Sequence, residues 1–459
     1  MDTLYRAKLP DAVGVGLPSM SSSGSEDPWE ELSRLPMGTH LELVDEAGRT
    51  WTGTVVPRHE LSGERVLPLK LSSGYNVGIL IGPACRYRRL GLPPASGRGE
   101  DVGAAPPGAP TDRPGPWVAL LTTGGTIASR VDYETGGVRP VRDERTILAF
   151  YPELERRGRV RVVPVFDRLS EEIVPDDWLV IGRHVVTAFA EGAEGVVVAH
   201  GTDTLGFTAA GLSFLLAGLP GPVVLVGAQR SPDRPSSDGA SNLRAAVEVA
   251  RDRRIGEVVV VLHAGLSDSR FAVHRGTWVR KMHSSRRDAF ESRNGPALGH
   301  VTEAGVQLDL AVRPPSTGPA RLDGPIDPAA GLLWFYPGLS PERAEAFATG
   351  LRGLVLAGTG LGHVASAHLG WIRAATARGL LVAMTTQCLG GNADPFVYAT
   401  GRELVRAGVV YLGDLLPETA YAKLLWALGH ADDAAGATAL LTADRAGEFL
   451  HRHGPGGAD

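Results

Sequence analysis

The chain has few cysteines and no long hydrophobic run. Its two cysteines, Cys85 and Cys388, are far apart and lack the close Cys/His spacing of a metal site. We therefore expect neither a structural zinc site nor a disulfide framework, and we expect no bound metal or cofactor. No apolar run reaches the length of a membrane span, and the N-terminus lacks the apolar core of a signal peptide. These absences predict a cytoplasmic protein.

A strong charge bias is also absent. The formal net charge is −5 over 459 residues, which gives no basic footprint for a nucleic acid or a membrane surface. The chain also contains no P-loop motif for a nucleotide phosphate. An apolar fraction of 43% is typical of globular proteins, and the length allows two or three domains.

Lysine is scarce. Of the 46 basic residues only four are lysines: Lys8, Lys70, Lys281 and Lys423. Arginine stays protonated in a protein, whereas a partly buried lysine can lose its proton and act as a base. A lysine retained in this chain is therefore a candidate for a role that arginine cannot fill.

The amino-acid composition changes several times along the chain. Residues 1–35 are rich in Ser, Gly and Pro and predict a disordered tail. Residues 36–90 contain four short alternating segments, which predict a small all-β barrel. Those segments are 41–44, 51–56, 66–71 and 77–81. Residues 91–116 are dense in Gly, Pro and Ala and predict a linker.

An α/β fold is predicted for the remainder. Apolar runs alternate with a helical pattern over residues 117–313, which favours a large parallel sheet covered by helices. The expected strands are 117–120, 195–200, 222–226 and 257–262, with a helix over 205–217. A Pro/Gly-rich hinge is expected at 314–330, followed by a smaller C-terminal α/β domain over 331–459.

The first chemical motif follows the apolar run 117–120. Two glycines and a threonine come at the predicted end of a strand, in the segment Leu121–Ser129. Open α/β sheets bind ligands at this edge. Gly125 would let the backbone lie close to a substrate or oxyanion, and Thr126 would offer a hydroxyl. Taken alone, the segment is better explained as a tight turn with no chemical role.

Three further segments carry reactive groups. Thr202 and Asp203 follow the most apolar strand, although for that pair in isolation capping of the next helix is the more usual explanation. Lys281 is a candidate for proton transfer, or else an ordinary surface lysine. Ser170 and Glu171 could hold the polar ends of a small zwitterionic substrate, or form a solvated helix start.

Together these segments resemble the asparaginase/glutaminase amidohydrolases. The similarity is greater to the GatD family of archaeal Glu-tRNA(Gln) amidotransferases, because the segment 69–76 in the small N-terminal domain also matches. The motifs that carry the resemblance are TGGTIAS at 123–129, HGTDT at 200–204, GAQRSP at 227–232 continuing through Asp238-Gly239, VRKMH at 279–283 and LPETA at 416–420. The resemblance implies an asparaginase-like α/β fold.

The resemblance also implies a role for each candidate residue. Thr126 and Thr202 would be the catalytic threonines, with Asp203 and Lys281 grouped around Thr202. Ser170 would bind the substrate α-carboxylate. The roles of three further positions are as follows: Glu171 would meet the α-ammonium together with Asp203, Gly125 would lie at the substrate, and Tyr133 would belong to a mobile lid.

The activity implied is hydrolysis of a Gln or Asn carboxamide with release of ammonia. One hypothesis is a glutaminase subunit of a homodimer that feeds a transamidating partner acting on Glu-tRNA(Gln). A second is a stand-alone asparaginase, or a deamidase of Asn or Gln in peptides, with the N-terminal domain docking the substrate. The segment 390–395, Gly-Gly-Asn-Ala-Asp-Pro, motivates the second because it departs from the GatD pattern. A third hypothesis is a non-enzymatic ligand-binding protein.

Overall fold

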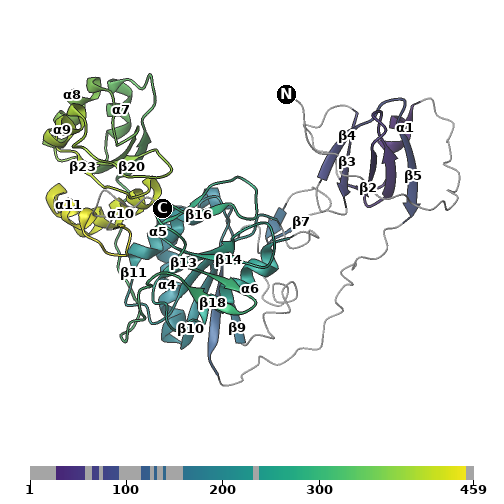
Figure 1. Ribbon diagram of the computed structural model, residues 1–459, viewed down its shortest axis with the longest axis horizontal. Helices are drawn as coiled ribbons and strands as arrows, with labels where there is room; N and C mark the ends of the chain where they lie inside the picture. Colours follow the sequence, from purple (N-terminus) through teal and green to yellow (C-terminus); the bar gives the residue numbers. More distant parts are fainter. Residues whose placement is uncertain are drawn as a thin grey trace. The chain divides into compact units, whose positions relative to one another are not determined.

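The computed structural model describes the chain in several stretches, and Figure 1 draws their helices and strands. The described residues are 27–56, 65–71, 76–91, 115–124, 129–131, 138–140, 159–230 and 237–450. The chain divides into two compact units, one formed by residues 1–111 with 132–137 and the other by residues 112–131 with 138–459.

The first unit contains an antiparallel five-stranded sheet in the order β4-β3-β2-β1-β5. Its strands are β1 (His40–Val44), β2 (Thr50–Val55), β3 (Val66–Leu71), β4 (Asn76–Leu80) and β5 (Arg86–Gly91). Leu41 and Leu43 are buried on one face of β1, while Glu42 between them pairs with Arg88 at 3.1 Å. This alternation confirms the all-β prediction. Strand β5 was not predicted, because three of its six residues are arginine.

A short helix precedes this sheet and corrects the predicted tail. Helix α1 (Pro28–Leu32) begins after Asp27, whose side chain accepts a hydrogen bond from the Trp29 amide. Leu32 and Leu35 are buried in the core of the sheet. The prediction of disorder through residue 35 is therefore wrong for this stretch. The helix is ordered because it packs against the sheet. Five residues are too few to show a recognisable helical pattern in the sequence.

The second unit is built on an eight-stranded sheet in the order β18-β17-β14-β13-β12-β10-β6-β9. The strands are β6 (Trp117–Thr122), β9 (Arg159–Pro164), β10 (Ala193–Ala199), β12 (Val223–Val226), β13 (Val258–His263), β14 (Phe271–Arg275), β17 (Gly299–Thr302) and β18 (Gly305–Leu308). The sheet is parallel from β9 to β13, as predicted, and antiparallel beyond. A short turn follows β13, and it leaves no room for the crossover helix that a parallel strand requires.

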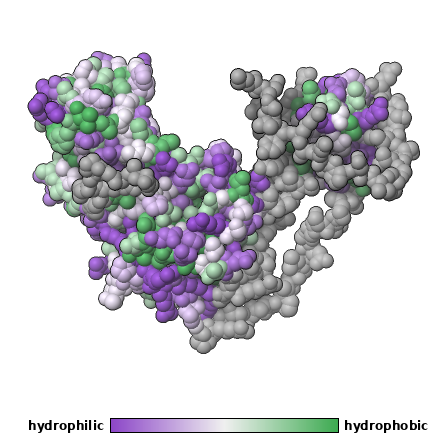
Figure 2. Space-filling model, viewed as in Figure 1, coloured by the Kyte–Doolittle hydropathy of each residue, from purple (hydrophilic) through white to green (hydrophobic). Residues whose placement is uncertain are grey.

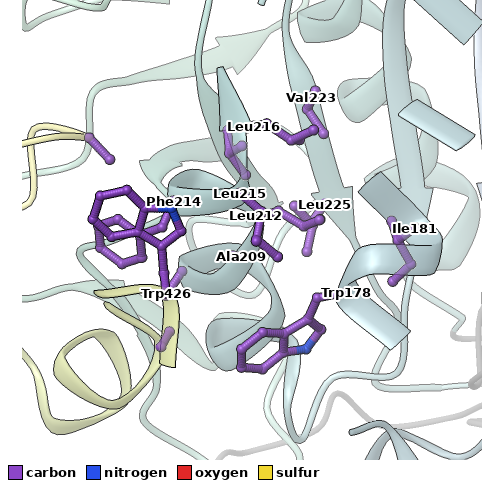
Figure 3. Close-up of a cluster of buried hydrophobic side chains, with 14 of the residues drawn as sticks. Trp178, Ile181, Ala209, Leu212, Phe214, Leu215, Leu216, Val223, Leu225 and Trp426 are labelled. Carbon is purple, nitrogen blue, oxygen red and sulfur yellow. The ribbon is translucent and has the colours of Figure 1, made fainter. Parts of the chain in front are cut away.

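Helices cover both faces of this sheet. They are α4 (Pro175–Ala190), α5 (Leu205–Leu215) and α6 (Gly239–Ala250). Successive residues of β10 point to opposite faces, so Val196 packs with the cluster of α4 and α5, and Val197 with that of α6. Figure 3 shows the first cluster, in which Trp178 and Leu212 lie near the sheet residue Leu225. Burial on both faces explains why these strands are uninterrupted apolar runs.

The C-terminal part of this unit is a smaller α/β layer. Its four parallel strands, in the order β20-β21-β22-β23, are β20 (Ala330–Trp334), β21 (Gly353–Gly358), β22 (Leu381–Thr386) and β23 (Val410–Tyr411). Its helices are α7 (Pro341–Ala348), α8 (Leu369–Ala377), α9 (Ala399–Arg406), α10 (Pro417–His430) and α11 (Ala434–Thr442). The predicted hinge is attached to the larger sheet domain, because strand β19 (Arg321–Leu322) pairs with β11 (Leu216–Ala217).

The segment 443–450 holds the two α/β layers together. Lys423 of α10 and Glu448 form an ion pair of 2.5 Å with both side chains fully buried. Burial lowers the pKa of Lys423, and the Glu448 carboxylate opposes that shift. Arg445 stacks on Trp426 of α10, and the Glu448 carbonyl accepts a hydrogen bond from the Trp278 indole. The segment therefore bridges α10 and the larger sheet domain.

The described helices are all too short or too polar to cross a membrane. On the face drawn in Figure 2, hydrophilic residues are interspersed with smaller hydrophobic areas.

Candidate active site

Four neighbouring strands bring the predicted residues to one edge of the large sheet. Strands β9, β6, β10 and β12 are adjacent and parallel, so their carboxyl ends lie at the same edge. The chain passes from β6 to β9 on one side and returns to β10 on the other. This reversal is a topological switch point, where open sheets form a crevice for ligands.

Lys281 lies between a hydroxyl and a carboxylate. Its Nζ donates to Thr202 Oγ1 at 2.7 Å and to Asp203 Oδ1 at 2.7 Å. Lys281 ends strand β15 (Val279–Lys281), which pairs with β16 (Phe290–Ser292) in a hairpin beside the sheet. Lys281 therefore forms one polar group with two residues that lie 79 and 78 positions before it in the sequence.

The structure does not support helix capping by Thr202 and Asp203, or a surface position for Lys281. Thr204, rather than Thr202 or Asp203, is the N-cap of α5, and within the described residues no side chain caps that helix. The Lys281 side chain is only 13% exposed, so it is not a surface lysine. The Asp203 side chain is 66% exposed, which leaves its carboxylate open to a solute.

Ser170 and Glu171 lie beside Asp203. They begin a turn of 3₁₀ helix (Ser170–Glu172) after β9. Ser170 Oγ is 3.5 Å from Asp203 Oδ2 and 3.4 Å from Glu171 Oε2. The Ser170 carbonyl accepts a hydrogen bond of 2.6 Å from Thr204 Oγ1, which ties this turn to the loop after β10. The three predicted substrate-binding side chains therefore lie together.

The loop after β6 is fixed by a close backbone contact. Gly124 has φ +97°, and a Cβ placed there would lie 2.4 Å from the carbonyl oxygen of Arg168. Only glycine fits this position. Arg168 in turn pairs with the buried carboxylate of Asp177 at 2.6 Å. Arg168 and Asp177 are not distinctive in the sequence, because an acidic residue in the first turn of a helix is common.

The loop after β12 packs under Thr202. A Cβ on Gly227 would lie 2.7 Å from Thr202 Cγ2, so this position also requires glycine. The buried Asp238 carboxylate accepts hydrogen bonds from the amides of Gln229 and Arg230 and from Asn242 Nδ2, at 3.0–3.1 Å. Asp238 therefore holds this loop in place. In the sequence, Asp238 was indicated only as part of the third motif that carries the resemblance to the family.

His200 connects β10 to the Thr202 loop and is fully buried. Burial lowers the pKa of His200 to about 4, so the ring is neutral near pH 7. Its Nδ1–H donates to the Gly201 carbonyl at 2.7 Å, and its Nε2 accepts from the Thr208 hydroxyl at 2.9 Å. Both ring nitrogens are thus engaged in the fold, which makes His200 a structural residue.

Three predicted site residues, Gly125, Thr126 and Tyr133, lie outside the described residues. Within the described stretches, no group of three or more His, Cys, Asp or Glu side chains is arranged to hold a metal ion.

Comparison with known proteins agrees with this geometry. Residues 117–313 match the asparaginase N-terminal family, and residues 331–441 match the glutaminase/asparaginase C-terminal domain. Residues 37–86 match the GatD N-terminal domain. A glutamyl-tRNA(Gln) amidotransferase subunit of the GatD type from Saccharolobus islandicus is 43% identical over 87% of this chain and 90% of its own length. This chain belongs to the asparaginase/glutaminase family.

Other members of the family differ in how much of the chain they match. The GatD-type amidotransferase subunit from Methanopyrus kandleri is 42% identical over 90% of this chain and 92% of its own length. The thermostable L-asparaginase from Thermococcus kodakarensis aligns with a TM-score of 0.66 and 34% identity, covering 73% of this chain and all of its own. L-asparaginase I from Vibrio cholerae aligns with a TM-score of 0.64 and 28% identity, over 73% of this chain and 99% of its own. As a family member with this fold, the chain is an amidohydrolase.

Proposed function

We propose that this amidohydrolase is the glutaminase subunit of a Glu-tRNA(Gln) amidotransferase. It hydrolyses the side-chain carboxamide of Gln and passes ammonia to a transamidating partner subunit. Support comes from the GatD-type relatives, which match about nine-tenths of the chain including the region of the small N-terminal domain. The matched L-asparaginases span 73% of it. We further propose that the protein is a homodimer with domains at 36–90, 117–313 and 331–459.

The contact of Lys281 with Thr202 and Asp203 is the observation that carries the chemistry. Amide hydrolysis needs a nucleophile, a group that moves its proton, and a proton for the departing ammonia. A threonine hydroxyl is a weak nucleophile unless a neighbouring base removes its proton. Lysine can serve as that base, and an arginine in the same place could not.

We assign the attack on the amide carbon to Thr126. Its hydroxyl oxygen bonds to the carbon, giving a tetrahedral oxyanion beside the backbone at Gly125. The Lys281–Thr202 pair takes up the proton of the Thr126 hydroxyl and passes it to the amide nitrogen, the C–N bond breaks, and ammonia leaves. Water then adds to the resulting ester, releases the acid and restores the hydroxyl. Tyr133 belongs to the lid that closes over this step.

Substrate selection falls to the groups around Asp203. Ser170 Oγ can donate to the α-carboxylate of an amino acid. Glu171 and the exposed Asp203 carboxylate can receive its α-ammonium. A zwitterion of the size of Gln or Asn fits this division, because the Ser170 hydroxyl lies within 3.5 Å of both carboxylates.

Ammonia release from Gln by the purified protein tests the assigned roles. Thr202→Val and Lys281→Ala should each reduce it by at least about a thousandfold, since both remove a group needed for proton transfer. Two controls match them: Thr438→Val removes a hydroxyl on helix α11, and Arg378→Ala removes an exposed cation. Full activity of Lys281→Ala would disprove the role given to the lysine.

A stand-alone asparaginase or peptide deamidase is the second candidate. Gly390, Gly391 and Asn392 line a cavity of about 850 Å³, which is within the size range of pockets for small ligands. Gly391 N donates to Asn294 Oδ1, so this loop lies against the hairpin that carries Lys281. Faster ammonia release from an Asn-containing peptide than from free Gln, without any partner subunit, would favour this candidate.

A further inference from the structure

Helix α10 of the C-terminal domain contacts strand β15 and the residues just before it. Two residues before the strand, the Thr277 carbonyl accepts a buried hydrogen bond of 2.7 Å from Thr419 Oγ1. In the middle of the strand, Arg280 Nε lies 3.2 Å from Glu418 Oε1. Arg280 directly precedes Lys281. The short strand that presents the lysine is thus held by two neighbouring residues at the start of one helix.

Arg280 is enclosed by the C-terminal domain. Its guanidinium lies 5.5 Å from the ring centre of Trp334, at the end of β20. The side chains of Arg280 and Glu418 are only 20% and 14% exposed. Within the described residues, Arg280 Nη1 and Glu418 Oε2 are buried without another hydrogen-bond partner. Each charge therefore depends on the other, because a partly buried charge is costly when unpaired.

The same helix also contacts helix α5, which directly follows the loop that carries Thr202. Tyr421 of α10 packs edge-on against Phe207 in the first turn of α5, with ring centres 6.3 Å apart. Helix α5 begins two residues after Asp203. Helix α10 thus contacts the strand that carries Lys281 and the helix that follows the Thr202 loop.

A lysine side chain has four rotatable bonds, so holding its amine at one hydroxyl costs conformational entropy. Strand β15, which ends at Lys281, has only three residues, so its own backbone hydrogen bonds hold it weakly. We propose that Arg280, Glu418 and Thr419 are positioning residues that set the place of the Lys281 amine. The C-terminal domain then completes the site through the backbone of β15. This inference rests on the role proposed for Lys281.

The rate of ammonia release by folded enzyme tests the proposal. Glu418→Ala and Arg280→Ala should each lower kcat by about tenfold or more, with KM within twofold, because a displacement of about 1 Å at a reacting group costs up to about a hundredfold. The double variant should lose no more than either single one, because both changes break the same contact. Rates are expressed per folded molecule, so that lost stability alone does not count.

The ion pair between Arg251 and Glu194 provides the matched control. It has a similar separation, 3.4 Å, and similar exposure, 24% and 14%, but Glu194 lies at the opposite end of β10 from Thr202. Glu194→Ala should leave kcat within twofold. If Glu418→Ala does not fold, Thr419→Val serves instead. Its control is Thr376→Val, which removes a comparable hydroxyl contact of 2.6 Å between α8 and Ala407.

The outcomes separate this inference from the proposed function. Loss of activity in Lys281→Ala together with normal kcat in Glu418→Ala and Thr419→Val would overturn the positioning role alone. Retained activity in Lys281→Ala would overturn the assigned chemistry as well. A fall in kcat in Glu194→Ala equal to that in Glu418→Ala would also overturn the positioning role, because any lost ion pair would then have the same effect.

Discussion

Lys281 illustrates what the scarcity of lysine could and could not indicate. Two of the four lysines, Lys281 and Lys423, are placed where arginine would not substitute. Lys281 contacts a hydroxyl and an exposed carboxylate at the ligand-binding edge of the sheet. Lys423 lies in the core between a carboxylate and aromatic rings. The scarcity of lysine therefore indicated a core residue as well as a candidate site residue, and only the neighbouring motifs distinguish the two.

At the same scale, Gly227 controls the place of Thr202. We expect Gly227→Ala to reduce ammonia release by on the order of a hundredfold, because the new methyl group would displace the threonine that it meets at 2.7 Å. Circular dichroism and an ammonia assay would measure folding and activity. The control is Gly265→Ala, where a Cβ meets nothing within 4 Å and activity should be unchanged. Equal activity of both variants would contradict the expectation.

At the scale of elements, the loop after β12 depends on one buried carboxylate. Asp238→Asn places an amide group against the amides of Gln229 and Arg230, so at least one donor loses its acceptor. We expect the free energy of unfolding to fall by about 2–3 kcal/mol, measured by urea denaturation. Asp433→Asn is the comparison, because Asp433 caps α11 through a single exposed hydrogen bond and its replacement should cost less than about 1 kcal/mol.

The elements also show where prediction from sequence succeeded. Strands buried on both faces, such as β10 and β13, are continuous apolar runs and were predicted. The hairpin of β15 and β16 was not, because strands of three residues have no measurable period. The residues after the strand ends were predicted as a group from a resemblance to a family. Local patterns alone could not separate Asp203 from an ordinary helix cap.

The contacts of Asp238 and Arg168 could not be predicted from local sequence patterns for a different reason. Each acts on backbone groups of another loop, and such contacts depend on how the loops are folded together. No pattern within one segment records a partner in another. The family motif included Asp238, but only the structure shows which groups Asp238 and Arg168 contact.

At the scale of the whole molecule, the buried pair of Lys423 and Glu448 joins the two α/β layers. Lys423→Met leaves the Glu448 carboxylate buried without its cation. We expect a loss of about 3–5 kcal/mol in the free energy of unfolding, measured by urea denaturation. For comparison, Arg378→Met removes an exposed cation that lies 3.4 Å from Glu345, and it should cost less than about 1 kcal/mol. Similar losses in the two variants would argue against a joining role.

The position of the segment 443–450 has a consequence for synthesis. The ribosome releases the large sheet domain first, and its helix α5 carries Phe214, which packs in the finished molecule beside Trp426 and Lys423. That face stays open to water until α10 and then residues 443–450 emerge. The nascent chain therefore exposes this apolar face from the synthesis of α5 until that of α10, and exposed apolar surface of this kind favours aggregation unless chaperones cover it.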